Sequence, residues 1–471
     1  MNILILNGSP KGQYSTTLHT CLYLQKKFPE QSFTIFDAGK KIRSVENDFT
    51  EAKALVEAAD VLLFCYPVYT FLVPCQLHRF IELLKESGAC IQGKIATQVS
   101  TSKHFYDTTA HAFIKDNCAD MGLNYIDGLS ADMDDLLTET GRKQAEDWFK
   151  LLLWKIERRD FSRPQAFSRP QLTSAGIPAE TPAGAAASGF PAETSAAGIL
   201  ADAPAEKRPG RKAVIVADLG IAPDAKERLR SLIDAFRAAF PYECDLVDIS
   251  EFPFKGGCMS CFHCAATGKC IYPDRFDDFL RENIHRHDAI IYAFSIKDHS
   301  MGARFKMYDD RQFCNGHRTV TMGTPFGYLV DGCLSQEENL RTVIEARAQV
   351  GGNYLAGIAG TEFAPDREVQ LLCERICFAF EHSYQPPQNF YGVGGMRIFR
   401  DLIYKMRGLM RADHKFFKSH GQYDFPQKQW KTSLLMYLVG WMMNSPKMRA
   451  KMGSKMNDGM IQAYRQVVEK A

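Results

Sequence analysis

The sequence has almost no surplus of charge and no long apolar run. Lysine plus arginine number 57 and aspartate plus glutamate 55 among 471 residues, which gives a formal net charge of +2. Nucleic acid is therefore not expected as a partner. No stretch reaches the ~18 apolar residues that a membrane span needs, so no transmembrane helix is expected. The first residues, MNILILNGSP, lack the basic start and small-residue cleavage site of a secretory signal.

The sequence also lacks the spread of cysteines expected for a disulfide framework. Of its 14 cysteines, four lie within thirteen residues, and most of the others stand in apolar contexts where reduced thiols pack. We therefore expect a reducing, cytoplasmic compartment.

Charge is distributed unevenly along the chain. Residues 396–471 hold 15 Lys/Arg and 5 Asp/Glu, a net of +10, which leaves −8 for the preceding residues. This segment is rich in Met and includes an apolar helix expected over 431–443, which is too short to span a bilayer. A buried or domain-covering helix is one interpretation, and peripheral docking on a membrane surface is the alternative that the basic charge favours.

Two stretches of the chain repeat one pattern of apolar strand, polar loop and amphipathic helix. Strands are expected at 2–7, 61–67 and 94–102, and again at 212–220 and 288–295. Val/Ile/Leu-rich strands that alternate with helices are typical of parallel sheets buried on both faces. The predicted fold class is therefore α/β, with two tandem doubly wound parallel sheets and a helical C-terminal extension.

Composition sets the expected domain boundaries. A segment rich in Ala, Pro, Ser, Gly and Thr cannot bury enough apolar surface to order itself, and it is interpreted as a linker. We expect a first domain at 1–157, this linker at 158–211, a second domain at 212–385 and the basic helical extension at 386–471.

The first strand is followed by a loop suited to a phosphate monoester. A loop between a strand and a helix N-terminus presents unpaired N–H groups and the positive end of the helix dipole. Hydroxyls and one lysine add donors, and the candidate residues are Gly8, Ser9, Pro10, Lys11, Ser15, Thr16 and Thr17. The loop fits neither the P-loop nor the Rossmann glycine pattern. The alternative is that its hydroxyls are simple helix caps.

Two further strand ends are expected at the same sheet edge. One carries the rigid aromatic loop Pro67, Val68 and Tyr69, and the other ends in hydroxyls that include Ser100. Aromatic groups stack on planar heterocycles, so the three loops together suggest a mononucleotide with a flat ring.

At these residues the sequence resembles the flavodoxin-like NAD(P)H-dependent FMN reductase family. The resemblance lies in the GSP loop that runs to Thr17, in the PVY loop, and in Pro74, Gln76 and Leu77 of the helix that follows. It implies that the first loop holds the FMN phosphate and that Pro67, Val68, Tyr69 and Ser100 border the ring. Lys11 stands where the family usually has arginine, and a lysine can still serve a phosphate.

The second copy has lost these features. Its first loop, 218–224, carries two acids and no hydroxyls, so it should repel a phosphate, and no PVY loop follows its second strand. Instead it contains Cys258, Cys261, Cys264 and Cys270 in a compact run. Three thiolates at x2 spacing can occupy three corners of a four-iron four-sulfur cluster, while zinc or a redox-active or packed cysteine loop are the alternatives.

This run is similar to the cysteine motif of the iron-sulfur flavoproteins, a branch of the same family in which the cysteines ligate a 4Fe-4S cluster near FMN. There the flavin and the cysteines share one domain, whereas here they would lie in different copies. We therefore expect the copies to pack as a pseudo-dimer that brings residues 66–71 close to 258–270. The motif at 391–395, YGVGG, follows two prolines rather than a strand and is interpreted as a turn.

The expected function is that of an FMN-dependent NAD(P)H oxidoreductase. Electrons would pass from flavin, through a 4Fe-4S cluster, to an acceptor, and no side chain is required as acid or base. One alternative is a non-enzymatic flavin electron carrier or scaffold that docks a partner, and another is a cluster-less quinone or nitro reductase. The expected partners are a nicotinamide nucleotide and an electron acceptor.

Overall fold

The computed structural model of the chain describes residues 1–162, 207–315, 317–362, 364–447, 467 and 469. Residues Met1–His414 form one compact unit, and a second unit begins at Lys415. Most of the linker predicted for 158–211 lies outside the described residues.

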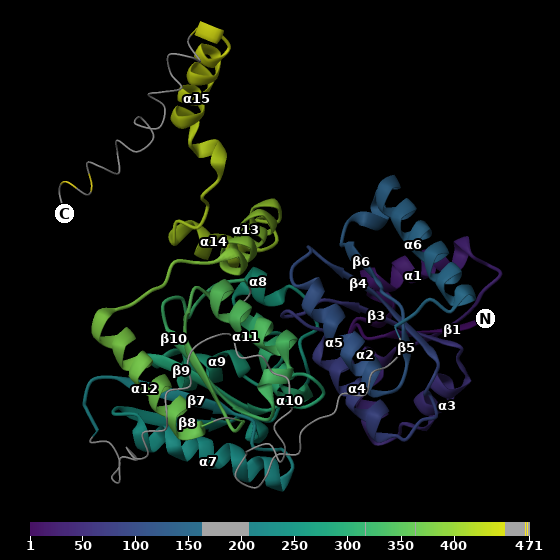
Figure 1. The fold of residues 1–471 in the computed structure, drawn as a ribbon, viewed down its shortest axis with the longest axis horizontal. Coiled ribbons are helices and arrows are strands. Elements are labelled where there is room, and N and C mark those ends of the chain that lie inside the picture. Colours follow the sequence, from purple (N-terminus) through teal and green to yellow (C-terminus); the bar gives the residue numbers. More distant parts are fainter. Residues whose placement is uncertain (163–206, 316, 363, 448–466, 468, 470–471) are drawn as a thin grey trace. The chain divides into compact units, whose positions relative to one another are not determined.

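The first sheet is parallel and has the strand order β2-β1-β3-β4-β5, with β6 paired to β4. Its strands are β1 (Asn2–Asn7), β2 (Ser32–Phe36), β3 (Val61–Pro67), β4 (Ile95–Ser102), β5 (Asn124–Tyr125) and β6 (Leu129–Asp132). The helices around it are α1 (Thr16–Lys27), α2 (Ala38–Asn47), α3 (Thr50–Ala58), α4 (Cys75–Glu86), α5 (Asp107–Asp120) and α6 (Glu139–Arg158). They are coloured purple to blue in Figure 1.

The second sheet repeats this order as β8-β7-β9-β10-β11, and it is also parallel. Its strands are β7 (Lys212–Ala217), β8 (Glu243–Asp248), β9 (Ala289–Ser295), β10 (Pro325–Asp331) and β11 (Tyr354–Gly360). Its helices are α7 (Pro223–Ala239), α8 (His263–Thr267), α9 (Phe276–Leu280), α10 (Gly302–Arg311), α11 (Glu338–Gly351) and α12 (Pro365–His382).

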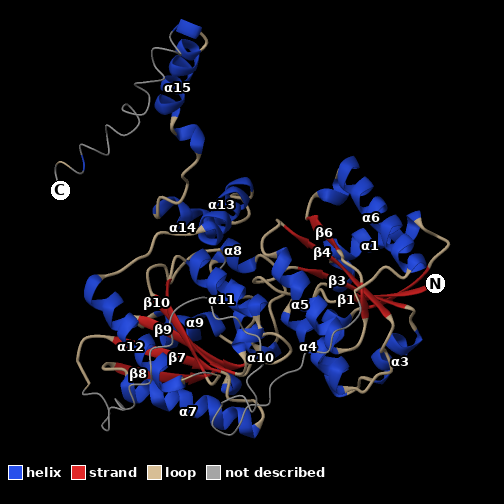
Figure 2. Cartoon of the chain, viewed as in Figure 1, coloured by secondary structure: helices blue, strands red, loops and turns tan. Residues whose placement is uncertain are grey.

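Both sheets therefore have the 2-1-3-4-5 order of the flavodoxin-like doubly wound fold. The predicted fold class is confirmed, and strands β1 and β3 have the bounds that the sequence predicted. Figure 2 shows the two sets of strands in red among the helices in blue.

Alternating side chains of each central strand enter different cores. In β1, Ile3 and Ile5 pack toward α1 and α6, whereas Leu4 and Leu6 join a larger core with residues of the second sheet. Val214 and Val216 of β7 enter the same large core. Because this core is continuous between the two sheets, the inner faces of the two copies stabilise each other.

Helices α4 and α10 pack against each other with reciprocal caps. Asp310 near the end of α10 accepts hydrogen bonds from the Cys75 N–H, at 2.8 Å, and from the Thr70 hydroxyl, at 2.9 Å. Glu82 of α4 accepts one from the Ala303 N–H at 2.8 Å. Each helix thus supplies the carboxylate that caps the start of the other, as in a pseudo-twofold pair. The predicted pseudo-dimer packing agrees with these contacts.

The prediction of a turn at 391–395 is wrong, because these residues lie inside helix α13 (Phe390–Lys405). Asn389 caps this helix by accepting from the N–H groups of Tyr391 and Gly392. A Cβ on Gly392 would lie 2.8 Å from the Gln349 carbonyl oxygen, and one on Gly395 2.7 Å from Val350. The glycines therefore serve a close helix contact, and packing outweighs their low helix propensity.

Two further helices follow, α14 (Arg411–Ser419) and α15 (Trp430–Met443). The helix predicted at 431–443 is confirmed as α15, within one residue. Among the described helices, none is both long and apolar enough to cross a membrane.

Candidate functional site

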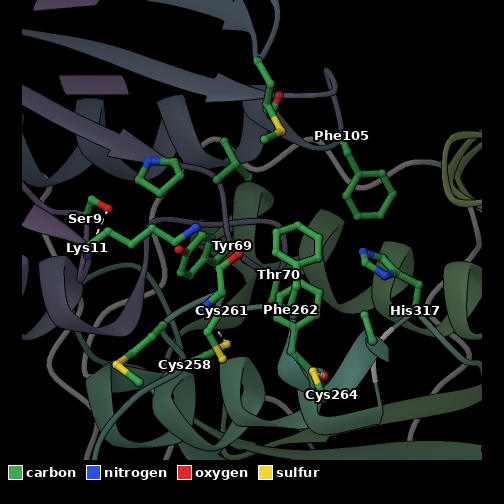
Figure 3. A pocket seen from close by; sticks show the side chains of 18 of the residues that line it. Ser9, Lys11, Tyr69, Thr70, Phe105, Cys258, Cys261, Phe262, Cys264 and His317 are labelled. Carbon is green, nitrogen blue, oxygen red and sulfur yellow. Dashed lines mark hydrogen bonds between the residues drawn. The ribbon is translucent and has the colours of Figure 1, made fainter. Parts of the chain in front are cut away.

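A cavity of about 210 Å³ lies where the strand ends of the first sheet meet the cysteine loop of the second copy. The first copy contributes Ser9, Lys11, Ser15, Thr16, Pro67, Val68, Tyr69, Thr70, Thr101, Ser102, Lys103 and Phe105. The second copy contributes residues 258–262, Cys264, Cys270, Arg311, Phe313 and His317, and α13 adds Ile398, Phe399 and Leu402. The predicted approach of 66–71 to 258–270 is confirmed by this shared lining. Figure 3 shows both groups around one space.

The N-terminus of α1 opens on this cavity. Ser15 is its cap, and its hydroxyl accepts from the Leu18 N–H at 3.4 Å while its carbonyl accepts from the His19 N–H at 3.3 Å. The N–H groups of Thr16 and Thr17 have no acceptor within the helix, as at any helix start. Together with the helix dipole they form a position suited to an anion.

Four of the predicted binding residues do not line the cavity, and two of these have packing roles. A Cβ on Gly8 would lie 2.6 Å from the Leu77 side chain, so Gly8 allows α4 to approach the loop. Thr17 is buried, and its hydroxyl lies 2.6 Å from that of Thr101. Both residues hold the loop against its neighbours.

The other two are Pro10 and Ser100, which are also absent from the cavity lining. The Ser100 hydroxyl lies 2.8 Å from His111 Nε2. Its neighbours Thr101 and Ser102, at the end of β4, line the cavity instead.

Lys11 lies between the loop predicted to bind phosphate and the cysteine loop. Its ammonium lies 5.9 Å from the ring centre of Phe262. Burial lowers the pKa of Lys11, while the nearby thiols of Cys258 and Cys261 act in the opposite direction. Lys11 is the one cation of the predicted phosphate loop, and Figure 3 shows its side chain between that loop and the cysteines.

The cysteine loop is anchored by Arg311, which is almost completely buried. Its guanidinium donates to both carboxylate oxygens of Asp274, at 2.7 and 2.9 Å, and to the Gly256 carbonyl at 2.8 Å. A fourth contact reaches the Cys270 sulfur at 3.6 Å. A bidentate pair of this kind fixes orientation as well as position. No sequence motif pointed to Arg311.

The four cysteines do not converge on one point. Cys261 is exposed, and the Cys264 thiol donates to the Phe313 carbonyl at 2.8 Å. Burial raises the pKa of Cys258, and it raises that of Cys264 to about 11. In the described part of the chain, no three His, Cys, Asp or Glu side chains are close enough to hold one metal ion. As arranged, these thiols do not fit a cluster.

The far wall of the cavity is aromatic and includes an ionisable side chain that the sequence analysis missed. His317 packs edge-on against Phe313 and Phe399, with ring centres 5.9 and 4.9 Å apart. Its Nδ1 lies 3.1 Å from Asp413, which is completely buried at the start of α14. His317 and Asp413 are 96 residues apart in the chain, so no local pattern could have indicated this pair.

The equivalent loop of the second sheet is occupied by its own side chains. The N–H groups of Leu219 and Gly220 donate to Asp248 and Asp218, at 3.2 and 3.1 Å. Arg304 fills the space above, donating to Asp218 at 3.0 Å and to the Gly220 carbonyl at 2.7 Å. The donors that would hold a phosphate are therefore already bound.

Comparison with known proteins gives one family match. Residues 1–117 match the family described as NADPH-dependent FMN reductase. No curated protein matches the chain.

Solved structures similar to part of the chain have low sequence identity. Smu.1420 from Streptococcus mutans has 16% identity and a TM-score of 0.26, over 32% of this chain and 98% of that one. An FMN-dependent NADH-azoreductase from Bacillus anthracis in complex with FMN has 13% identity and a TM-score of 0.25, over 32% and 98%. An NAD(P)H:quinone oxidoreductase from Methanothermobacter marburgensis has 14% identity and a TM-score of 0.28, over 33% of this chain and 96% of that one.

Proposed function

We propose that this chain is an FMN-dependent NAD(P)H oxidoreductase whose FMN lies in the cavity at the carboxyl edge of the first sheet. One observation carries the proposal: the cavity joins an open helix N-terminus with hydroxyls and a lysine to an aromatic strand-end loop, within the segment that matches the reductase family. When held there, FMN would supply the chemistry of hydride acceptance from reduced nicotinamide and of electron transfer to an acceptor.

The residues that line the cavity fit the phosphate and the ring of FMN. The phosphate would rest on the N–H groups at the start of α1, among the hydroxyls of Ser9, Ser15 and Thr16. The flat ring would lie along the backbone and side chains of 67–70 and of Thr101 and Ser102. Lys11 would supply the positive charge.

The second copy should bind no FMN, because its loop donors are taken by Asp218 and Asp248 and its space by Arg304. Its role would be to close the site of the first copy. It supplies the cysteine loop and the aromatic wall, which would hold an electron acceptor against the ring and exclude water.

FMN binding is tested by a matched pair of charge substitutions. Ser15→Asp places a carboxylate at the N-cap of α1, where the phosphate would bind, and FMN should no longer be retained. Ala222→Asp makes the same change at the N-cap of α7 in the second copy and should leave one FMN per chain. Aspartate is a favourable cap, so both variants should fold. Equal retention by both, or two FMN per chain, contradicts the assignment.

Reduction by nicotinamide separates an enzyme from an electron carrier. Anaerobic mixing of the FMN-loaded protein with NADPH or NADH should bleach the flavin absorbance within seconds. If neither nucleotide does so while a chemical reductant does, the carrier interpretation is the correct one.

The 4Fe-4S cluster stays a prediction of the cysteine spacing and of the resemblance to the iron-sulfur flavoproteins. Since the thiols do not fit a cluster as they are arranged, no step of the proposed reaction passes through one. Iron and sulfide analysis of anaerobically purified protein tests this directly. Stoichiometric iron that is lost in Cys261→Ser would show that the cysteine loop reorganises around a cluster.

A further inference from the structure

The pairing of His317 with Asp413 has the geometry of an oriented proton donor. Asp413 Oδ2 lies 3.1 Å from His317 Nδ1 and accepts from the His317 backbone N–H at 3.2 Å. Two contacts to the same carboxylate oxygen fix both the backbone and the ring. Because the two ring nitrogens lie on different sides of imidazole, Nε2 takes no part in the contact with Asp413, and His317 is among the side chains that line the cavity.

The buried carboxylate of Asp413 lies between two basic side chains, His317 and Arg318. Its carboxylate is fully inaccessible, and its second oxygen lies 3.5 Å from the Arg318 guanidinium. A buried carboxylate requires partners, and these two basic side chains supply them. Cys264 is a further ionisable neighbour, whose pKa burial raises and Asp413 raises further. Phe313 and Phe399, which pack on the ring, are apolar.

The position of His317 in the cavity is opposite the phosphate loop. In Figure 3, Ser9 and Lys11 lie at one end of the space and His317 at the other, with Thr70 and Phe262 between them. A ring bound along 67–70 would therefore have its phosphate at the far end from His317. An acceptor bound between that ring and the aromatic wall would face Nε2.

We propose that His317, oriented by Asp413, donates the proton that completes reduction of a planar carbonyl acceptor of the quinoid type, an inference that rests on the proposed function. The nicotinamide is oxidised and the acceptor is reduced by two electrons, delivered as a hydride equivalent by way of FMN. The hydride equivalent forms an O–H bond at one carbonyl oxygen, both carbonyl π bonds pass into the aromatic ring, and the second oxygen is left as a phenolate. The phenolate takes the proton from Nε2 of the His317 imidazolium, so that an N–H bond breaks and the second O–H bond forms. The neutral ring keeps its proton on Nδ1 toward Asp413, and solvent restores the imidazolium. His317 is then a catalytic residue and Asp413 a positioning residue.

The test compares two acceptors that differ in their need for a proton. Benzoquinone takes up protons on reduction, whereas ferricyanide takes electrons alone. His317→Gln should lower the ratio of the benzoquinone rate to the ferricyanide rate by at least about tenfold, since general acid catalysis contributes ~10²–10⁴-fold. The matched control is His382→Gln, at an exposed position at the end of α12, which should leave the ratio unchanged. A ratio that His317→Gln does not change overturns the proposal.

A second readout needs neither FMN nor turnover. Nitrogen NMR of the ring in the flavin-free protein should find the neutral His317 with its proton on Nδ1, and Asp413→Asn should shift it toward Nε2. A neutral ring protonated on Nε2 in the unsubstituted protein overturns the assignment. If instead the nicotinamide fails to reduce FMN while the Nδ1 tautomer is present, the proposed function has failed and the orientation of His317 by Asp413 stands.

Discussion

Gly8 follows β1 and shows how a single residue governs the packing of the loop beside the cavity. The sequence placed Gly8 among the candidate residues of a phosphate-binding loop. The structure adds that α4 passes so near that a Cβ would lie 2.6 Å from Leu77 Cδ2 and 2.7 Å from its Cβ. Leu77 belongs to the core and is fully buried, so it has no room to move away.

Gly8→Ala should therefore destabilise the protein by about 1–3 kcal/mol, the usual cost of overpacking, and weaken FMN retention. Gly394→Ala is the matched control, because nothing lies within 4 Å of its added Cβ and it stands inside a helix. It should be neutral or stabilising by up to about 1 kcal/mol. Urea unfolding of the two variants measures the difference, and equal stabilities would contradict the packing role of Gly8.

At the scale of elements, α4 and α10 form the contact that joins the two copies. Lys306 of α10 is completely buried, pairs with Asp310 one turn later, and donates to the Tyr69 carbonyl at 2.9 Å. Asp310 in turn accepts from Cys75 and Thr70. Each of these groups would be unsatisfied without the others, so the pair holds the aromatic loop of the cavity against the second copy.

Asp310→Ala should cost about 3–5 kcal/mol, because it leaves the Lys306 charge buried without its partner. The chain contains a matched exposed pair at the same i,i+4 spacing, Lys143–Asp147, with side chains 73% and 49% exposed. Asp147→Ala should cost less than about 1 kcal/mol. Chemical denaturation of both variants is the measurement, and similar losses would show that the buried pair contributes little to the contact.

At the scale of the whole unit, His299 links the two copies a second time. It follows β9 and lies 3.1 Å from Asp120 of α5 and 3.0 Å from Glu337, which precedes α11. Burial lowers the pKa of His299, but the hydrogen bonds and charges of Asp120 and Glu337 outweigh it and raise the pKa from 6.5 to about 9. The charged imidazole therefore bridges an acid from each copy.

This bridge predicts that stability depends on pH in a defined window. Since the folded pKa of about 9 exceeds the unfolded value of 6.5, the contribution is complete below pH 6.5 and is lost as the pH rises through about 9. The contribution of this bridge to the free energy of unfolding should be roughly 3 kcal/mol. The measurement is the free energy of unfolding at both ends of the window, with His299→Gln as the variant that should abolish the difference. A loss of equal size in that variant would assign the pH dependence to other groups.

Much of the fold and part of the site followed from local patterns. The strands at 2–7 and 61–67 and the cap at Ser15 were predictable, because continuous apolar runs and a hydroxyl before a helix are local signals. The helix over 390–405 was not, since its glycines are explained only by the neighbouring α11. The similar backbone conformation of the turns at 70–71 and 298–299 was also not predictable from the sequence. Their sequences differ, yet all four residues have positive φ.

The sequence by itself determined the two repeats, the sheet class and the loop of the first copy, because strand periodicity, helix starts and turn chemistry act over a few residues. Tertiary structure alone decided which groups surround the cavity. Lys11 faces the cysteine loop, and Arg311 anchors that loop. His317 meets Asp413. These groups come from distant segments, and the packing of α4 against α10 and the shared core between the sheets bring Lys11 to the cavity that Arg311 and His317 also line.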